Sequence, residues 1–320
     1  MQTLTTEIKQ QALEFGFTKI GFAKAELLDE ESGRLSEWLS RGYHGTMDWM
    51  ARNVDKRSDP RNILPGAKSV ISVALNYYTD VRHSENEHEG KISRYAWGDD
   101  YHEILAGKLN RLLEFIKSKD PAAEGKVYVD TGPVLDKVWA QRAGIGWEGK
   151  HTNVITTDYG SWVFLGEIIL NLELEYDEAA TDHCGSCTLC IEACPTQAIT
   201  EPYVLDSTLC ISYLTIEHRG EIAEELGEKF DRWVYGCDIC QDVCPWNQKF
   251  SQPSSMREFY PRDFNVAPDI KHLTEMSQIE FSEKYRKSPM KRTKHAGIVR
   301  NAKLITSSQH SVEVNRKEHG

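Results

Sequence analysis

The chain has no long apolar run. Its longest candidate, Trp162 to Leu172, is interrupted by Glu167, whereas a membrane-spanning helix needs about 20 apolar residues. The first residues, MQTLTTEIKQQALEFGF, contain no basic start followed by an apolar segment, so we expect no signal peptide. Both absences predict a cytoplasmic protein without membrane contact. In that compartment thiols stay reduced and can bind metal clusters.

Histidine shows no metal-ligand pattern. The 11 histidines include no H-E-x-x-H, the pattern of helical zinc sites.

One stretch of the chain contains no acidic residue. The net charge is −11, yet residues 284–303 contain eight Lys or Arg and no Asp or Glu. A basic stretch of this kind is usually a solvated face. In an acidic protein we favour nucleic acid as its partner, because phosphate neutralisation by Lys and Arg releases counterions.

The eight cysteines form two runs and one isolated residue. The first run is CGSCTLCIEACP at 184–195, with the C-x2-C-x2-C-x3-C-P spacing of [4Fe–4S] ligands, in which the fourth cysteine binds a different cluster from the first three. The second run, CDICQDVCP at 237–245, has Val234 in place of its first cysteine, and Cys210 is left to fill that position. The predicted ligands of one cluster are Cys184, Cys187, Cys190 and Cys244, and those of the other are Cys194, Cys210, Cys237 and Cys240. The alternatives are a zinc site, which needs two separated pairs, and a disulfide framework, which suits a small secreted domain.

Helix and strand patterns alternate over the first 175 residues. Helices are expected at 3–15, 101–117 and 134–143, an exposed loop at 81–91, and strands at 19–23, 68–78, 127–130, 153–157 and 162–172. The alternation favours one α/β domain at 1–175. The acidic stretch 173–182 marks the expected boundary with a cluster domain at 176–250. Residues 251–320 should form a basic, mainly helical segment.

Gly144, Gly146 and Gly149 form G-x-G-x-x-G. A helix is expected before them and a strand after them, the reverse of the dinucleotide-binding context. We expect a glycine-rich turn where the backbone approaches a flat ligand, with a plain tight turn as the alternative. Lys150 and His151 follow directly and are either ligand contacts or solvated.

Asp130 ends an expected strand just before Thr-Gly-Pro. A partly desolvated carboxyl there would have a raised pKa and donate a proton near neutral pH. The alternative, which the local sequence favours, is an Asp that caps a turn. The residues alone therefore indicate a redox protein with two clusters, an α/β domain and a basic tail.

Together these motifs resemble the epoxyqueuosine reductase family, which completes the tRNA base queuosine. The similarity covers most of the chain and includes both cysteine runs and the segments RSDPRNILPGAKS (57–69), RYAWG (94–98), VDTGPVL (129–135), AGIGWEGKH (143–151) and GCDICQDVCPWN (236–247). The resemblance implies an α+β or α/β multidomain fold, in which a nitroreductase-like N-terminal domain and a ferredoxin-like domain with two [4Fe–4S] clusters hold a base-off cobalamin. It also implies kinship with reductive dehalogenases. The chain has no D-x-H-x-x-G, the motif that supplies an axial histidine to cobalt in many corrinoid proteins. Its absence agrees with an implied cobalt that has no protein histidine ligand.

The resemblance also implies residue roles. Asp130 becomes the proton donor to the departing oxygen, which reverses the local preference for a cap. The clusters would reduce the cobalt, which would deoxygenate epoxyqueuosine at the wobble position of the anticodon. The implied corrin contacts are Arg57, Trp97, Asp130, Asn153, Val154, Leu165 and Ser212.

The implied partners are a tRNA with a GUN anticodon and an external low-potential electron donor, and we expect a monomer. The basic stretch would bind phosphates flanking the anticodon loop, through Arg286, Lys287, Lys291, Arg292, Lys294 and Arg300. Many family members have a longer helical-repeat tail after this stretch. In this sequence, the corresponding residues are the polar SSQHSVEVNRKEHG. Two alternative functions are a reductive dehalogenase-like enzyme on a small substrate and a non-catalytic iron–sulfur module that docks on RNA.

Overall fold

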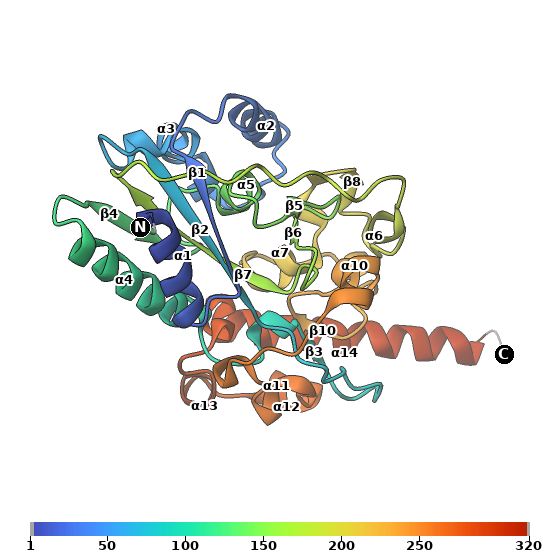
Figure 1. Cartoon of the computed structure of the whole chain (residues 1–320). Coiled ribbons are helices and arrows are strands. Elements are labelled where there is room, and N and C mark those ends of the chain that lie inside the picture. Colours follow the sequence, from blue (N-terminus) through green and yellow to red (C-terminus); the bar gives the residue numbers. More distant parts are fainter. Residues whose placement is uncertain (1–2, 319–320) are drawn as a thin grey trace. The chain divides into compact units, whose positions relative to one another are not determined.

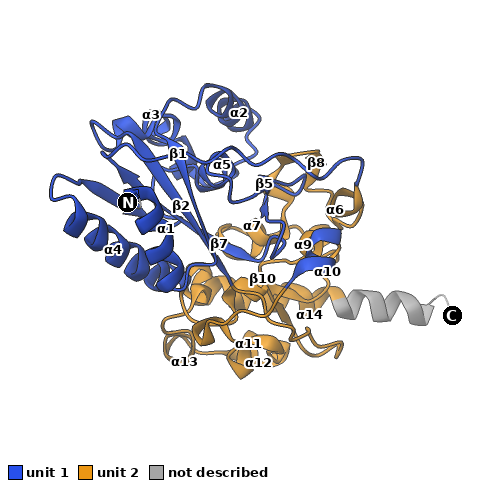
Figure 2. Cartoon of the chain, viewed as in Figure 1, with its two compact units in different colours: residues 1–76, 101–187, 245–251 blue, residues 77–100, 188–244, 252–320 orange. Residues whose placement is uncertain are grey.

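The computed structural model describes residues 3–318, with side chains up to Ser308. The chain divides into two compact units (Figure 2): unit 1 contains residues 1–76, 101–187 and 245–251, and unit 2 contains residues 77–100, 188–244 and 252–320. Both units are discontinuous in sequence. The division predicted from the sequence, at residues 175 and 250, does not coincide with these units.

Unit 1 is built on a four-stranded sheet in the order β1-β2-β7-β4 (Figure 1). Its strands are β1 (Lys19–Lys24), β2 (Ser69–Asn76), β4 (Gly125–Tyr128) and β7 (Val163–Leu170). All three strand pairs are antiparallel, so unit 1 is an α+β unit. The α/β arrangement predicted from the alternation of elements is wrong, because alternation alone does not require parallel strands.

Different helices cover the two faces of this sheet. On one face, α4 (Tyr101–Lys119) packs on β7 and β4, and α1 (Leu4–Glu14) packs on α4 and β1. Gly166 of β7 lies directly beneath α4, since a Cβ there would meet Leu109 at 2.8 Å. On the other face, α5 (Asp136–Arg142) buries Trp139 and Ala140 against β2 and β7.

Shorter elements complete unit 1. The expected strand at 153–157 is reduced to β6, and the segment between β1 and β2 contains two α-helices and two 3-10 helices. These elements are α2 (Asp29–Ser40), α3 (Val54–Ser58), α10 (Pro245–Phe250), β5 (Trp147–Glu148), β6 (Val154–Ile155) and the 3-10 helices η1 (Asp48–Ala51) and η2 (Pro60–Asn62).

Unit 2 is mainly helical, and its longest helix, α14 (Lys294–Glu318), packs on α12, α8, α7 and β10. Its two small sheets pair β3 (Lys91–Ile92) with β10 (Trp233–Tyr235) and β8 (Ile199–Glu201) with β9 (Val204–Leu205). The other elements are α6 (Leu189–Glu192), α7 (Ile211–Ile216), α8 (Glu224–Gly227), α9 (Ile239–Asp242), α11 (Asp263–Val266), α12 (Ile270–Glu275), α13 (Gln278–Lys284), η3 (Arg94–Ala96), η4 (Ser207–Leu209), η5 (Arg257–Phe259) and η6 (Pro289–Thr293). The helical character predicted beyond residue 250 is confirmed over these residues. Among the helices of residues 3–318, none has both the length and the apolarity needed to cross a membrane.

Candidate active site and cluster ligands

Asp130 lies at the apex of a tight turn after β4. The strand ends at Tyr128, two residues earlier than predicted. The N–H of Thr131 donates to the carbonyl oxygen of Val129 at 2.5 Å, so Asp130 is the central residue of a γ-turn. Its φ of +57° is in the left-handed region, which costs a non-glycine residue on the order of 1–3 kcal/mol and is found preferentially at functional sites. The prediction that Asp130 is the last residue of a strand is therefore wrong.

Two side chains at the start of α4 bind the Asp130 carboxylate. The Tyr101 hydroxyl donates to Oδ2 at 2.7 Å, and Nε2 of His102 lies 3.3 Å from the same oxygen. The Tyr101 ring is stacked on Phe164 of β7, with centroids 4.3 Å apart. Desolvation raises the pKa of Asp130, but hydrogen bonds from His102 and Tyr101 and the charge of Lys137 outweigh it, so the net pKa lies below the usual value. Desolvation is the largest single effect, but the combined hydrogen bonds and positive charges exceed it. The raised pKa that the sequence predicted is wrong.

The sequence does not predict Tyr101 and His102 as site residues. The available signal is their place at the start of an expected helix, shortly after the RYAWG segment. Tyr101 and Asp130 are 29 residues apart, and no local pattern shows that the two segments meet.

A buried pair of carboxyl groups lies behind the Asp130 turn. Glu167 of β7 is 0% exposed and lies within hydrogen-bonding reach of Asp136, the first residue of α5. Desolvation, with repulsion from neighbouring carboxylates, raises the pKa of both groups. The sequence analysis noted Glu167 only as an interruption of an apolar stretch, although an acid inside a buried strand is itself a signal.

Arg57 is connected to the same turn. Its guanidinium donates to the carbonyl oxygens of Trp49 at 3.1 Å and Gly132 at 3.4 Å. Burial lowers the pKa of Arg57, and the negative charge of Asp136 partly offsets this. The predicted corrin contact therefore lies beside Asp130, with its donors directed at backbone carbonyls.

Lys137 joins the Asp130 turn to the segment that contains Asn153. Its Nζ donates to the carbonyl oxygen of Thr152 at 2.6 Å, and its charge acts on both Asp130 and His151. Nδ1 of His151 accepts the N–H of Asn153 at 3.2 Å, and Nε2 has no hydrogen-bond partner within the described part of the chain. Burial and the Lys137 charge lower the pKa of His151 to about 4. The ring is therefore a neutral imidazole with one free nitrogen, and it is not solvated.

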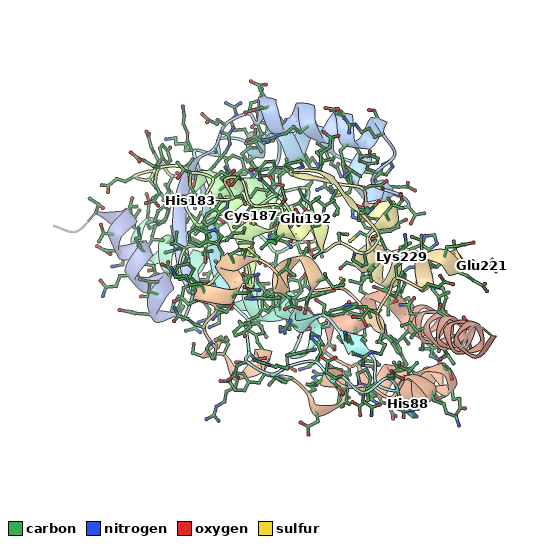
Figure 3. The ribbon with its side chains drawn as sticks, turned by 90° about the vertical axis from the view of Figure 1, so that its right-hand side faces the viewer. His88, His183, Cys187, Glu192, Glu221 and Lys229 are labelled. Atoms are coloured by element: carbon green, nitrogen blue, oxygen red, sulfur yellow. The ribbon has the colours of Figure 1, made fainter. Side chains whose placement is uncertain are left out.

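The first two cysteines lie in unit 1, on a loop anchored by Lys150 (Cys187 is labelled in Figure 3). Nζ of the buried Lys150 donates to the carbonyl oxygens of Gly185 at 2.6 Å and Cys187 at 2.9 Å. Burial raises the pKa of Cys184, while the N–H of Lys150 and the indole of Trp147 partly offset this. Lys150 is therefore a structural part of the cysteine loop.

Five cysteines of unit 2 are coupled through their charges. Burial raises the pKa of Cys240, and the thiolates of Cys210, Cys190 and Cys194 add to the effect. The pKa of Cys237 is raised by burial and then by Cys240 and Cys210. All eight cysteines are free, so the disulfide alternative is wrong. In residues 3–318, no three His, Cys, Asp or Glu side chains surround one metal-ion position; a four-iron cluster distributes four thiolates over its irons.

Asp238, between two of these cysteines, anchors their loop. It is fully buried and accepts hydrogen bonds from the Ser93 hydroxyl, from the N–H of Arg94 at 2.9 Å and from the Arg94 guanidinium at 3.1 Å. The backbone N–H groups of Tyr213 and Ser212 and the hydroxyl of Ser212 bond the thiol of Cys210. Ser212, predicted as a corrin contact, thus lies beside a predicted cluster ligand.

Two family models match the chain. One, described as "Epoxyqueuosine reductase QueG, DUF1730", matches residues 57–131, and the other, "4Fe-4S double cluster binding domain", matches residues 183–247. The epoxyqueuosine reductase of Cellulophaga algicola is 48% identical over 298 residues, which are 93% of this chain and 96% of that protein. The chain belongs to the epoxyqueuosine reductase family. The relative from Synechocystis is 48% identical over 275 residues, covering 86% of this chain and 94% of its own length.

Solved structures of epoxyqueuosine reductases have the same fold. A crystal structure with an epoxyqueuosine-modified stem loop of a tyrosine tRNA matches with a TM-score of 0.89 and 36% identity, covering 95% of this chain and 81% of that chain. A Bacillus subtilis structure, in which the catalytic aspartate loop is swung out of the active site, matches with a TM-score of 0.88 and 35% identity over the same shares.

The remaining predicted corrin contacts have apolar surroundings. Val154 and the half-buried Leu165 pack in the core beneath α5. Trp97 belongs to unit 2 and is 1% exposed, and its indole N–H donates to the carbonyl oxygen of Ile92 at 2.7 Å. The Trp97 side chain is thus part of the unit 2 interior, and its corrin contact stays a prediction.

The glycine-rich segment packs against the protein's own backbone. Helix α5 precedes it and strand β6 follows it, as expected, while β5 lies between Gly146 and Gly149, so the segment lacks the strand-then-helix context of a dinucleotide fingerprint. Gly144 has a φ of +72°, and a Cβ at Gly146 would lie 2.2 Å from the carbonyl oxygen of Ile155 in β6. The tight-turn alternative accounts for both glycines, and an approach to a ligand stays a prediction.

The predicted phosphate contacts fall into two groups. Five are exposed: Arg286, Lys287, Lys291, Arg292 and Lys294. Arg300 instead donates to the carbonyl oxygens of Leu214, His218 and Gly220 at 2.7–2.8 Å, and burial lowers its pKa. Because these donors already bind backbone carbonyls, the structure gives Arg300 a structural role, and its phosphate contact stays a prediction.

We predict that Tyr101→Phe raises the pKa of Asp130. The hydroxyl stabilises the ionised carboxyl, so its loss shifts the equilibrium towards the protonated form. Carboxyl ¹³C chemical shifts of labelled aspartate, followed across acidic pH, measure the change. Tyr43→Phe removes a hydroxyl elsewhere in unit 1 and should leave the titration in place. An unchanged Asp130 titration in Tyr101→Phe contradicts the prediction.

Proposed function

We propose that this chain is an oxidoreductase that reduces epoxyqueuosine to queuosine at the wobble position of tRNA. The observation that carries the proposal is the Asp130 carboxyl, presented on a left-handed turn and bound by Tyr101 and His102. A chain with 48% identity to an epoxyqueuosine reductase over nearly its full length supports this function over the two alternatives from the sequence. An enzyme acting on tRNA would work in the cytoplasm, in agreement with the sequence-based expectation.

The proposed cofactors are two [4Fe–4S] clusters and a base-off cobalamin. The charges of Cys194, Cys210, Cys237 and Cys240 are coupled in unit 2, which supports placing these four at one cluster, although Cys190 is coupled to Cys240 as well. For the other, the set of Cys184, Cys187, Cys190 and Cys244 stays a prediction from cysteine spacing. When bound, these groups supply low-potential electrons and the cobalt chemistry at the epoxide.

In unit 1, two features fit a corrin with many amide side groups. The buried Nε2–H of the neutral His151, whose Nδ1 is already an acceptor, would donate a hydrogen bond to the oxygen of such an amide group. The neighbouring Asn153 has an amide of its own, whose oxygen lies 3.5 Å from Nζ of Lys137. We propose this segment, with Arg57, Val154 and Leu165, as the cobalamin-contacting part of unit 1.

Asp130 would donate the proton to the departing oxygen. Because Oδ2 accepts the Tyr101 hydroxyl, we assign the donated proton to Oδ1. At neutral pH the lowered pKa makes Asp130 a carboxylate. A bound tRNA would cover the exposed side chain and remove water from it, which raises the pKa and favours the protonated acid. Tyr101 and His102 would keep the carboxyl oriented during this change.

We predict that Asp130→Asn retains the fold and both clusters but lowers turnover of epoxyqueuosine-containing tRNA by roughly 10²-fold or more, the usual scale for a general acid. The assay is nucleoside analysis of the product tRNA. The control Asp120→Asn changes a turn carboxylate that accepts the N–H of Ala122 and should stay within a few-fold of wild type. If Asp130→Asn does too, another residue donates the proton.

We predict that Cys210→Ser damages only the cluster of Cys194, Cys237 and Cys240. Iron content after anaerobic reconstitution should fall from about eight to about four per chain, since each cubane holds four irons. Thr208→Ser, two residues away, should keep about eight. Wild type with about four irons, or a serine variant with about eight, would disprove the ligand assignment.

We propose that the exposed part of the basic stretch binds tRNA phosphates. Lys291→Ala combined with Lys294→Ala should weaken all tRNAs alike and reduce the salt dependence of binding by about one logarithmic unit per lost contact. The pair omits Arg292, whose Nε lies 2.7 Å from a carboxylate oxygen of Glu217. Binding is measured at two salt concentrations. The control, Lys24→Ala with Lys117→Ala, makes the same charge change on exposed residues of unit 1. Equal salt slopes for both double variants would show that Lys291 and Lys294 make no phosphate contact.

A further inference from the structure

A carboxyl group interrupts an apolar face in the core of unit 1. Three cross-strand pairs of β2 and β7 lie on the face beneath α5: Val70 with Ile169, Ser72 with Glu167, and Ala74 with Leu165. The outer two pairs are apolar, and the middle pair is polar. Glu167 is 0% exposed, so an ionised side chain there would be strongly unfavourable without compensation.

The structure supplies a compensating group in Asp136. The Ser72 hydroxyl donates to Oε1 of Glu167 at 3.2 Å. Oε2 of Glu167 and Oδ1 of Asp136 are buried. Within residues 3–318, neither oxygen accepts a hydrogen bond from an N–H group or a hydroxyl. The two carboxyl groups are nevertheless within hydrogen-bonding reach of each other. Two carboxylates would repel, so a hydrogen bond between them requires a proton on one of them.

The same pair contacts the turn that presents Asp130. The backbone N–H of Asp130 donates to the Asp136 carboxylate. Asp130 is the residue of the turn with the left-handed φ of +57°. The charged groups around the pair are Asp130 on the turn and Arg57 on α3. Lys137 faces Asp130 from the next position of α5.

We propose that Asp136 and Glu167 share a single proton, and that this pair is a positioning device that fixes the Asp130 turn and keeps one negative charge behind it. The inference rests on the proposed function, because it concerns the proton donor of that reaction. Repulsion between Asp136 and Asp130 is mutual, so a charged Asp136 favours the protonated form of Asp130. The pair thereby opposes the hydrogen bonds from Tyr101 and His102, which favour the carboxylate.

The composition of the pair follows from these two tasks. Two ionised carboxyl groups would place a double charge in the core, and two apolar side chains would leave the N–H of Asp130 without its acceptor. One shared proton leaves a single charge and retains the acceptor. The pair thus meets both requirements with the least buried charge.

The shared proton is tested in the reconstituted holoenzyme by infrared difference spectroscopy of wild type against Glu167→Gln near neutral pH. Glutamine keeps the shape and can donate its amide to Asp136. Wild type should show the carbonyl stretch of a protonated carboxylic acid, which shifts in heavy water, and Glu167→Gln should lack it. If wild type shows no such band, the proposal is overturned, and the proposed function is unaffected.

The charge is tested with Asp136→Asn, which keeps an oxygen for the N–H of Asp130. In single turnover of epoxyqueuosine-containing tRNA, the alkaline limb of the pH profile should move to lower pH by about half a unit or more, because Asp130 loses its proton more readily. Glu167→Gln retains the charge on Asp136, so the alkaline limb of its pH profile should not move to lower pH. The control Asp158→Asn removes a carboxylate paired with Lys19 and should keep the wild-type limb.

The outcomes separate the two proposals. An unmoved limb in a folded, cluster-loaded Asp136→Asn overturns the positioning role. If Asp136→Asn does not fold, the infrared comparison of wild type with Glu167→Gln decides the proposal. If wild type itself does not reduce epoxyqueuosine in tRNA, the proposed function fails, while a protonated band that disappears in Glu167→Gln still supports the shared proton.

Discussion

Moving an ionised carboxyl group from water into a protein core is so unfavourable that the surrounding structure must neutralise it. In unit 1 this constraint falls on Glu167, at the centre of β7, with β2 on one side and β4 on the other. Its neighbours supply one hydroxyl from β2 and one carboxyl from the start of α5. Sheet, helix and the Asp130 turn therefore meet at one polar contact, and a shift of β7 would disturb all three.

The same constraint applies to the cysteines of unit 2. Burial raises the pKa of Cys237 and Cys240, and each neighbouring thiolate raises it further. Binding of positively charged iron would offset this repulsion and favour the thiolates. Their loop is fixed independently by Asp238, which is buried and held by charge-assisted hydrogen bonds from Arg94. Contacts of the protein itself thus place the thiols near one another.

The elements that local pattern determines were predictable, and those that depend on long-range pairing were not. Strand β2 and helix α4 follow from a β-branched run and from helical spacing, because each pattern reflects the burial of one element. The antiparallel order of the sheet was missed, since alternation does not encode direction. The cluster spacing was readable because all ligands except Cys210 lie in short runs. The γ-turn at Asp130 was not, because Tyr101, Arg57 and Asp136 reach it from separate elements.

The basic stretch shows why a charge count overstates a binding surface. The sequence gives eight cations between residues 284 and 303, yet Arg300 caps the carbonyl oxygens at the end of α7 and Arg292 lies against Glu217. The exposed cations are concentrated from residue 286 to 294, in the turn before η6, in η6 itself and at the first residue of α14. Phosphate contacts made by a short patch of this kind would carry little sequence information. On our proposal that the patch binds tRNA phosphates, selection of the modified nucleoside falls to the part of unit 1 that presents Asp130.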